Sequence, residues 1–429
     1  MLEAVWGSTR KCPREWFRTV IITGTNETRL HPVPPVADSA PAWNIFRLAE
    51  AAEGLDLHVI SPCEARQLPA LRQFPAKGRY HHVVFSRAQL VLYRSLLRHL
   101  LPLRLVVRRL TRLPDLLSWW YLRRVVRLLD ALRPDLVFIN DRPQYIHYLR
   151  QHVPPGRLFF LMRGEMGESR RFLHLVDGIV VSSRGMEEYA RELLDGRPMR
   201  IWYMPNSLGE EFPVPPAPPD RFTRRPRRIL YAGRLIPVKG VLELLKAFEV
   251  VHREMPDAEL LIYGGSDNAP SAGRPTPYEQ TLRETAAGLP VGSVRFMGYV
   301  PNREMGAHYV QAYVAVFPSI CKESFGMVAL EAMRCGTPVV ASRRPGFEEL
   351  VVHGETGLLV DDPTDIPALA EAMLRILRDP DLAGRMGEAG RRRSLAYRPE
   401  VVASRFATIV LDISERSREN GNCLRRTTP

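Results

Sequence analysis

Residues 227–248 read RRILYAGRLIPVKGVLELLKAF, and this stretch decides the fold class. The apolar run at 227–233 predicts a buried strand that ends at Gly233. The apolar residues of VLELLKAF, at 241–248, then predict a helix after a short loop. A strand, a glycine-containing turn and a helix in this order are the repeating unit of a doubly wound parallel sheet.

The same rhythm continues towards the C-terminus. Further strands are predicted where short apolar runs alternate with amphipathic helical stretches, namely ELLIYGG at 259–265, VRFMGYV at 294–300, YVAVFPS at 313–319 and PVVAS at 338–342. We therefore expect a Rossmann-like domain over residues 227–396.

An earlier part of the chain repeats this pattern. Buried strands are predicted for TVIITG at 19–24, LDLHVISP at 55–62, DLVFIN at 135–140, RLFFLM at 157–162 and DGIVVS at 177–182. The helix-like NIFRLAEAAEG separates the first two. A chain of 429 residues also fits two domains better than one. We expect a second Rossmann-like domain over residues 17–206.

The stretches outside these domains have distinct compositions. Residues 207–226 are rich in proline and poor in apolar residues, which predicts an extended, semi-rigid linker. Residues 399–415 place Val402, Phe406, Ile409, Val410 and Ile413 at helical spacing, which predicts a helix that packs against another element. A polar tail follows at 417–429.

The overall composition excludes several classes of protein. With 45% hydrophobic and 25% charged residues, the chain is neither disordered nor fibrous. The N-terminus lacks the layout of a secretory signal, and no apolar run approaches the ~20 residues of a membrane span, so we expect a cytoplasmic protein. The scattered cysteines are expected to be reduced thiols rather than disulfide or zinc ligands: Cys12, Cys63, Cys321, Cys335 and Cys423.

The formal net charge of +13 requires an anionic partner or surface. Residues 87–133 concentrate arginines among leucines, with Trp119, Trp120 and Tyr121 nearby. This composition is typical of a helix on an anionic membrane, and we expect peripheral contact at the inner face of the membrane. Ordinary amphipathic helices with a solvated basic face are the alternative. Nucleic acid is not expected as a partner, because no binding module accompanies the charge.

Two loops at predicted strand ends carry the candidate chemistry, because ligands of open α/β sheets bind there. In the first, YAGRLIPVKG at 231–240, Gly233 ends a strand, and Arg234 and Lys239 flank the turn into a helix. Two cations beside a helix N-terminus suit a diphosphate. A solvated surface loop with ordinary basic residues is the alternative.

The second loop, SICKESFGMVALEA at 319–332, contains two glutamates. We expect Ser324 to be the N-cap of a helix, with Glu323 just before it and Glu331 seven residues beyond it. Seven helical steps span about 10 Å and return to nearly the same face. One carboxylate can then meet sugar hydroxyls and the other a ribose, although glutamates are also common on ordinary helix faces.

Taken together, these loops resemble a known family. The motif G-R-L…K-G occurs at 233–240 and the motif E-x7-E at 323–331, followed by GTPVVAS at 336–342 and ETGLLV at 355–360. Over about residues 220–395 the chain resembles family 4 of the retaining glycosyltransferases. The resemblance implies the GT-B fold, in which two Rossmann-like domains face a central cleft, and a helix at 399–415 that packs back on the first domain.

The resemblance also implies roles for individual residues. Arg234 and Lys239 would hold the donor diphosphate, Glu323 the transferred sugar and Glu331 the nucleotide ribose. Arg234, Lys239 and Glu323 would thus be the catalytic group. The remaining donor-binding residues would be Gly233, Ser324, Phe325, Gly326 and Val328.

The N-terminal domain resembles the family more loosely. HPVPPV at 31–36 is similar to a segment of spore-coat-associated and lipopolysaccharide-type members, but ADSAPAW at 37–43 stands where those have a glycine pair. Asn206 matches an asparagine that usually ends this domain. The family often places a histidine near Arg163–Glu165, where this sequence reads MRGEMGE. Glu165 and Asn206 are the candidate acceptor-side residues; an ordinary surface glutamate is the alternative reading of Glu165.

The expected activity is transfer of a hexose, with retention, from a UDP- or GDP-linked sugar to a glycan, lipid-linked, cell-envelope or spore-coat acceptor. No D-x-D motif stands near a strand end, so neither a metal nor another cofactor is expected. Two alternatives remain. One is an inactive GT-B scaffold that serves as a structural coat or assembly protein, and the other is a different GT-B enzyme, such as a nucleotide-sugar epimerase or a sugar phosphorylase, the latter disfavoured by the lack of a pyridoxal-binding lysine motif.

Overall fold

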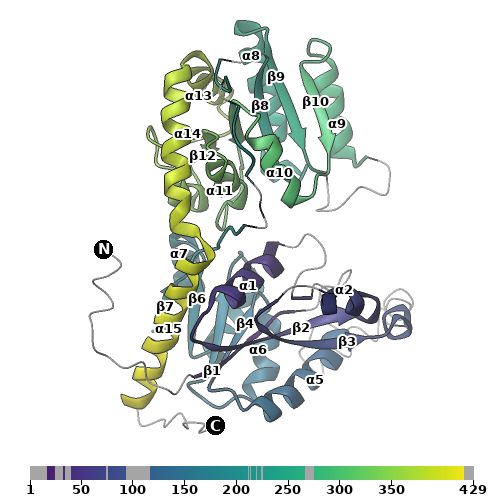
Figure 1. Cartoon of the computed structure of the whole chain (residues 1–429), viewed down its shortest axis with the longest axis vertical. Coiled ribbons are helices and arrows are strands. Elements are labelled where there is room, and N and C mark those ends of the chain that lie inside the picture. The colour runs from purple at the N-terminus through teal and green to yellow at the C-terminus, as the bar shows by residue number, and fades with distance from the viewer. Residues whose placement is uncertain are drawn as a thin grey trace.

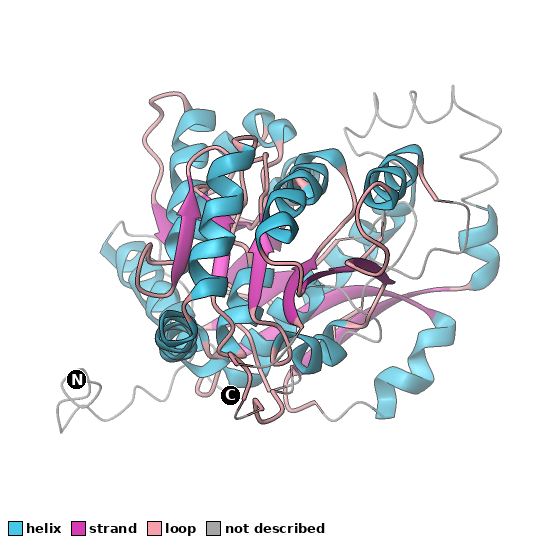
Figure 2. Cartoon of the chain, turned by 90° about the horizontal axis from the view of Figure 1, so that it is seen from above, coloured by secondary structure: helices cyan, strands magenta, loops and turns pink. Residues whose placement is uncertain are grey.

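The chain forms two α/β units that lie one above the other along the long axis of the molecule (Figure 1). The computed structural model describes residues 17–24, 32–33, 40–73, 76–92, 116–210, 212, 214–218, 220–223, 226–265 and 275–419. In the view along that axis, strands run through the middle and helices lie on both sides of them (Figure 2). The two doubly wound sheets confirm the predicted fold class.

The N-terminal domain contains a parallel sheet with seven strands among the described residues, in the order β3-β2-β1-β4-β5-β6-β7. The central strands are buried on both faces, as expected for a sheet covered twice by helices. The strands are β1 Arg18–Ile22, β2 Asp56–Glu64, β3 Arg79–Phe85, β4 Leu136–Asn140, β5 Leu158–Met162, β6 Gly178–Val181 and β7 Ile201–Tyr203.

Alternate residues of these strands enter two separate cores. Val20 and Ile22 pack with α5, α6 and α7, whereas Ile21 packs with α1 and the terminal helix α15. The helices of this domain are α1 Ala40–Ala51, α2 Leu68–Gln73, α5 Leu116–Leu132, α6 Pro143–Arg150 and α7 Arg184–Leu194.

Helix α15, Pro399–Glu419, runs from the C-terminal domain down along the N-terminal one (Figure 1). Its apolar side joins the core of the N-terminal domain, where the Phe406 ring lies 5.2 Å from that of Phe138. Trp202 of β7 donates a hydrogen bond of 2.8 Å to Asp412 of this helix. The helix continues to Glu419, three residues into the segment expected to be a polar tail; residues 420–429 lie outside the described part.

The C-terminal domain repeats the design with a six-stranded parallel sheet in the order β10-β9-β8-β11-β12-β13, counted over the described residues. The strands are β8 Arg227–Ala232, β9 Ala258–Tyr263, β10 Val294–Gly298, β11 Val314–Phe317, β12 Val339–Ser342 and β13 Gly357–Val360. The helices are α8 Val241–Glu254, α9 Pro277–Ala287, α10 Asn302–Tyr309, α11 Met327–Arg334, α12 Pro345–Leu350, α13 Ile366–Arg378 and α14 Pro380–Ser394.

The proline-rich connection between the domains is not the unpacked linker that its composition predicts. Phe212 is buried against the C-terminal core, and its ring lies 6.3 Å from that of Tyr309. The buried guanidinium of Arg221 is bound by oxygens of this domain, from Tyr309, Ala312, Cys335, Gly336 and Thr337. Because these bonds satisfy a buried cation, the connection is held to the C-terminal domain.

The sequence analysis does not predict three of the observed strands. β3 is an edge strand that carries polar Arg79, His81 and His82, and β7 and β13 have only three and four residues. A polar edge strand such as β3 lacks the apolar run that identifies buried strands, and the apolar runs of β7 and β13 are short.

Two smaller expectations concern thiols and membranes. Cys63, Cys321 and Cys335 are free thiols, whereas Cys12 and Cys423 lie outside the described residues. Within the described part of the chain, none of the helices combines the length and apolar character that crossing a bilayer requires.

Candidate active site

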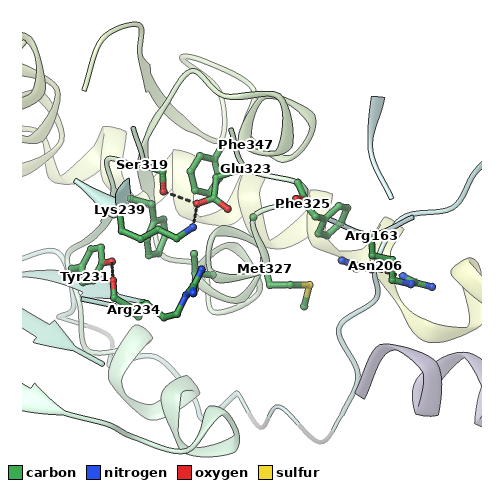
Figure 3. Close-up of a pocket in the computed structure, with 16 residues that line it drawn as sticks. Arg163, Asn206, Tyr231, Arg234, Lys239, Ser319, Glu323, Phe325, Met327 and Phe347 are labelled. Atoms are coloured by element: carbon green, nitrogen blue, oxygen red, sulfur yellow. Dashed lines mark hydrogen bonds and ion pairs between the residues drawn. The ribbon is translucent and has the colours of Figure 1, made fainter. Parts of the chain in front are cut away.

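A cavity of about 300 Å³ lies between the two domains, at the carboxyl ends of the C-terminal strands (Figure 3). Most of the predicted site residues line it: Asn206, Gly233, Arg234, Lys239, Glu323, Ser324, Phe325, Gly326 and Val328. The structure adds lining residues that were not predicted: Arg163, Tyr231, Ala232, Phe317, Ser319, Met327 and Phe347. Glu165 and Glu331 are not among the lining residues.

The first predicted loop leads from β8 into α8. Gly240 caps α8 with a positive φ of 69°, and a Cβ at this position would lie 1.9 Å from the carbonyl oxygen of Pro318. Only glycine allows this approach, which brings the start of α8 close to the end of β11. The Tyr231 hydroxyl donates a hydrogen bond of 3.0 Å to the Arg234 carbonyl and so holds the loop, while the Arg234 side chain is exposed.

Lys239 and Glu323 come from the two predicted loops and form an ion pair at one end of the cavity (Figure 3). Their side chains are only 19% and 15% exposed. Ser319 donates a second hydrogen bond, of 2.6 Å, to the same Glu323 oxygen. The pairing places a cation for phosphate and a carboxylate for hydroxyl groups within reach of one ligand.

The second predicted loop differs in one detail from the sequence analysis. Helix α11 begins at Met327 and its N-cap is Gly326, so the prediction of Ser324 as N-cap is wrong. Gly326 has a φ of 88°, and a Cβ there would lie 2.6 Å from the Phe347 ring. The chain therefore makes a left-handed turn at Gly326 before the helix starts, because glycine permits this conformation.

Glu331 lies inside the C-terminal domain rather than on the cavity wall. It is 5% exposed and accepts hydrogen bonds of 2.7 Å from the Asn302 amide and 3.3 Å from the Tyr309 hydroxyl. Burial, together with the nearby Glu331 carboxylate, raises the pKa of Tyr309, so this hydroxyl stays protonated. A role in ribose binding for Glu331 remains a prediction.

The N-terminal domain contributes a cation to the other end of the cavity. Arg163 directly follows β5 and donates 3.1 Å to the Asn140 side-chain oxygen and a further bond to that of Asn206. Its backbone N–H donates 2.8 Å to the Asp141 carboxylate, whose charge also acts on the guanidinium. Burial lowers the pKa of Arg163, but a guanidinium remains charged at neutral pH. The side chain therefore presents a positive charge whose hydrogen-bond partners are neutral.

Glu165, the candidate acceptor-side residue, is exposed and lies near Tyr189 of α7, whose pKa is raised by burial and by this glutamate. Glu165 is two residues beyond Arg163 but is not among the residues that line the cavity. The position of Arg163 in the sequence could have identified it as a site residue. It is the first residue beyond a fully buried strand, and such residues face the ligand crevice of an open α/β sheet. Asn206 does line the cavity.

The basic stretch at 87–133 is described only in part, because residues 93–115 lie outside the described ranges. In α5, Tyr121 is fully buried and donates 2.6 Å to the Thr23 carbonyl, so it belongs to the core and not to a surface. Arg123 and Arg127 are exposed, and Arg123 lies over the Trp119 ring at 4.8 Å. This arrangement fits either of the two interpretations given for the stretch.

The expected loop at 37–43 is also partly outside the described residues, which resume at Ala40 with helix α1. Among the described residues, no group of three or more His, Cys, Asp or Glu side chains is placed to hold a metal ion. Metal independence stays a prediction.

Comparison with known proteins gives similarities that centre on the C-terminal domain. Residues 219–393 match the family model of the glycosyl transferases group 1. Over 174 residues the chain is 37% identical to a GDP-mannose-dependent alpha-(1-6)-phosphatidylinositol monomannoside mannosyltransferase of Mycolicibacterium smegmatis, covering 39% of this chain and 43% of that protein. It is 34% identical over 263 residues to a D-inositol 3-phosphate glycosyltransferase of Corynebacterium glutamicum, covering 57% and 60% respectively. The chain thus spans about half the length of these relatives.

The fold is shared with solved structures over nearly the whole chain. A sucrose-phosphate synthase from Thermosynechococcus elongatus superposes with a TM-score of 0.68 at 20% identity, covering 93% of this chain and all of that one. This likeness confirms the two-domain GT-B fold. Over residues 219–393, the chain is similar to the glycosyl transferases group 1 family.

Proposed function

We propose that the protein is a retaining glycosyltransferase that moves a hexose from a UDP- or GDP-linked sugar to a lipid-linked or glycan acceptor. One observation carries the proposal: Arg234, Lys239 and Glu323 lie on one cavity with the start of α11, and Arg163 and Asn206 face them from the other domain. The name of the mycobacterial relative, which specifies GDP-mannose, supports a nucleotide-sugar donor.

The geometry suits stabilisation of a departing diphosphate. Arg234 and Lys239 provide positive charge, and the helix N-terminus of α11, whose first residues line the cavity, provides oriented N–H groups. In the proposed reaction the acceptor oxygen bonds to the anomeric carbon on the face from which the diphosphate leaves. The acceptor proton passes to the departing phosphate oxygen, so no protein base is required.

The acceptor is proposed to carry an anionic group. Arg163 supplies a cation on the N-terminal side of the cavity, and its side-chain bonds go to neutral amides. The names of both relatives include a phosphorylated inositol or its lipid. A phosphate-bearing polyol or lipid headgroup is the chemistry that these observations favour, whereas a spore-coat acceptor has no support beyond the sequence resemblance.

Contact with an anionic membrane at the cytoplasmic face is part of the proposal. The exposed Arg123 and Arg127 of α5 and the exposed Val91 and Leu92 support it. Flotation with vesicles of anionic and of zwitterionic lipid measures this contact. Co-flotation with the anionic vesicles alone is expected, and no flotation with either would favour the solvated-face interpretation.

The activity is tested by incubating the purified protein with UDP- and GDP-hexoses and phosphorylated polyols. We expect release of the nucleoside diphosphate only with both substrates present, an α-linked product from an α-linked donor by NMR, and unchanged rates with a chelator. Absence of release with every pair would favour the inactive-scaffold alternative, and an inverted or isomerised sugar would contradict the retaining mechanism.

A further inference from the structure

Helix α12, Pro345–Leu350, lies between the cavity and the N-terminal domain. Phe347 lines the cavity, and the helix also packs against α7 of the other domain. At Gly185 of α7, a Cβ would lie 2.0 Å from the Cβ of Pro345. Real Cβ atoms do not approach so closely, so the two helices meet across the domain boundary at a distance that only glycine allows.

The side chain of Glu349 joins the two domains beside this contact. One carboxylate oxygen accepts 2.8 Å from the backbone N–H of Arg184, and the other accepts from the Tyr203 hydroxyl. Both donors belong to the N-terminal domain. Burial and the Glu349 carboxylate raise the pKa of Tyr203, so its hydroxyl keeps the proton it donates. Arg405 of α15 lies over the Tyr203 ring at 4.8 Å and fixes its orientation.

Within its own domain, α12 is held rigidly to the donor loop. The Gly346 N–H donates 2.9 Å to the backbone carbonyl of Glu323, and a Cβ at Gly346 would lie 2.5 Å from that oxygen. At the other end of the helix, Arg393 of α14 donates to the carbonyls of Glu349 and Leu350 at 2.8 and 2.6 Å. A movement of α12 would therefore move the backbone of Glu323.

The contact also lies beside both places where the chain passes between the domains. Tyr203 ends β7 immediately before the first crossing, and Tyr397 precedes α15 at the second. The Leu208 N–H donates 3.0 Å to the Tyr397 carbonyl, which ties the two crossings together. A change in the angle between the domains at this point is transmitted directly to α12.

We propose that Glu349 is a positioning residue that couples docking of the two domains to the placement of Glu323. When α7 and Tyr203 hold Glu349, α12 keeps the Glu323 backbone where its side chain meets the donor sugar. This inference rests on the proposed function, because it takes the donor role of Glu323 from there. It assigns to Glu349 no contact with either substrate.

Gly185→Ala is the sharpest test, since it inserts a methyl group where Pro345 lies. Alanine favours helix more than glycine does, so a functional loss would not follow from a weakened α7. We expect kcat for transfer to fall about tenfold, as misplacement of reacting groups by a fraction of an ångström does. KM for the nucleotide sugar and Kd for the free nucleoside diphosphate should stay within about threefold. Gly167→Ala, at a position with no heavy atom within 4 Å, is the matched control and should change nothing.

Two milder variants test the hydrogen bonds themselves. Tyr203→Phe removes one donor and Glu349→Gln removes the charge while keeping the shape, and each should lower kcat several-fold. Because both act on one contact, the double variant should be no worse than the poorer single variant. Full additivity would contradict a shared role.

The outcomes separate this inference from the proposed function. Wild-type kcat in Gly185→Ala, or a parallel loss of melting temperature and nucleotide binding, would overturn the positioning role. Small-angle scattering gives a readout that needs no activity: the radius of gyration should rise in Gly185→Ala but not in Gly167→Ala, and an unchanged value would also overturn it. Failure of the wild-type protein to bind any nucleoside diphosphate would instead count against the proposed function.

Discussion

Lys239 is the residue on which the proposed donor site is expected to depend most. It pairs with Glu323 in the cavity and is the one predicted phosphate contact that is largely shielded from water. We expect Lys239→Ala to lower kcat/KM for the nucleotide sugar by about 10²–10³, the usual cost of removing one group that stabilises developing charge. Lys246→Ala, on the exposed side of α8, is the control and should retain wild-type kinetics. Full activity of Lys239→Ala would remove this residue from the site.

Arg163 is the residue on which binding of an anionic acceptor is expected to depend. Its charge faces the N-terminal end of the cavity and is bound only by neutral side-chain amides. Arg163→Ala should raise KM for a phosphate-bearing acceptor at least about tenfold, because charge-assisted hydrogen bonds are the stronger kind. The variant should change KM for an uncharged acceptor much less, and the exposed Arg171→Ala should change neither. Equal losses with both acceptors would contradict an anion-binding role.

Some of the site residues could be predicted from the sequence and others could not. Arg234 and Lys239 could be found because they flank a strand end and a helix start that are contiguous in the chain. Glu331 could not be placed, because its partners Asn302 and Tyr309 come from α10, more than twenty residues earlier. The periodicity of one helix does not reveal which neighbouring helix covers it.

Among the helices, α15 crosses from the C-terminal domain, and its apolar side completes the core of the N-terminal domain. Phe406 is fully buried against Phe138. Phe406→Ala should lower the free energy of unfolding of the N-terminal domain by about 3–5 kcal/mol, as large-to-small core changes do. Leu411→Ala, on the exposed side of the same helix, should cost less than about 0.5 kcal/mol. Urea unfolding followed by tryptophan fluorescence measures both, and equal effects would mean that α15 does not stabilise the domain through its buried side.

The edge of the N-terminal sheet is expected to be sensitive to acid. His58 of β2 and His81 of β3 stack with ring nitrogens 2.8 Å apart, and Asp56, Arg79 and Arg18 surround them. Burial lowers the pKa of both histidines below 6.5, and the nearby Asp56 opposes this only in part for His58.

The sign of the pH dependence follows from these shifts. Below pH 6.5 the unfolded chain takes up protons that the folded edge resists, so the contribution is complete above pH 6.5 and is lost as the pH falls towards the lowered values. Unfolding free energies measured between pH 7.5 and 5.5 should therefore decrease, and His81→Gln should flatten the decrease. An identical slope in that variant would contradict the assignment.

Helices and strands could be predicted where their burial requires a run of apolar residues. β5 is apolar throughout, and β4 is apolar up to its last residue, Asn140, because both faces of these strands are covered; both fall where the sequence places them. β3 escapes because an edge strand tolerates histidines and arginine. The packing of the proline-rich connection could not be predicted for a related reason. Phe212 and Arg221, which hold it to the C-terminal domain, stand alone in a polar stretch, and single buried residues give no periodic pattern in the sequence.

At the scale of the whole molecule, the two domains divide the proposed chemistry between them. The family match falls on the C-terminal domain, which supplies the donor loops, and that half could be identified from its motifs. The N-terminal domain contributes Arg163 and Asn206 across the cleft and carries no comparable motif. The proposed donor residues could therefore be selected from this sequence, whereas Arg163 on the proposed acceptor side required the spatial arrangement of the cleft.

The cavity between the domains is expected to bind a nucleotide-diphosphate sugar. Calorimetric titration of the wild-type protein, of Lys239→Ala and of Lys246→Ala with UDP, GDP, ADP and their hexose conjugates measures this binding. We expect saturable binding of one nucleotide at one site per chain, weakened at least about tenfold in Lys239→Ala and unchanged in Lys246→Ala. Binding of none of these nucleotides, or equal binding by all three proteins, would contradict it.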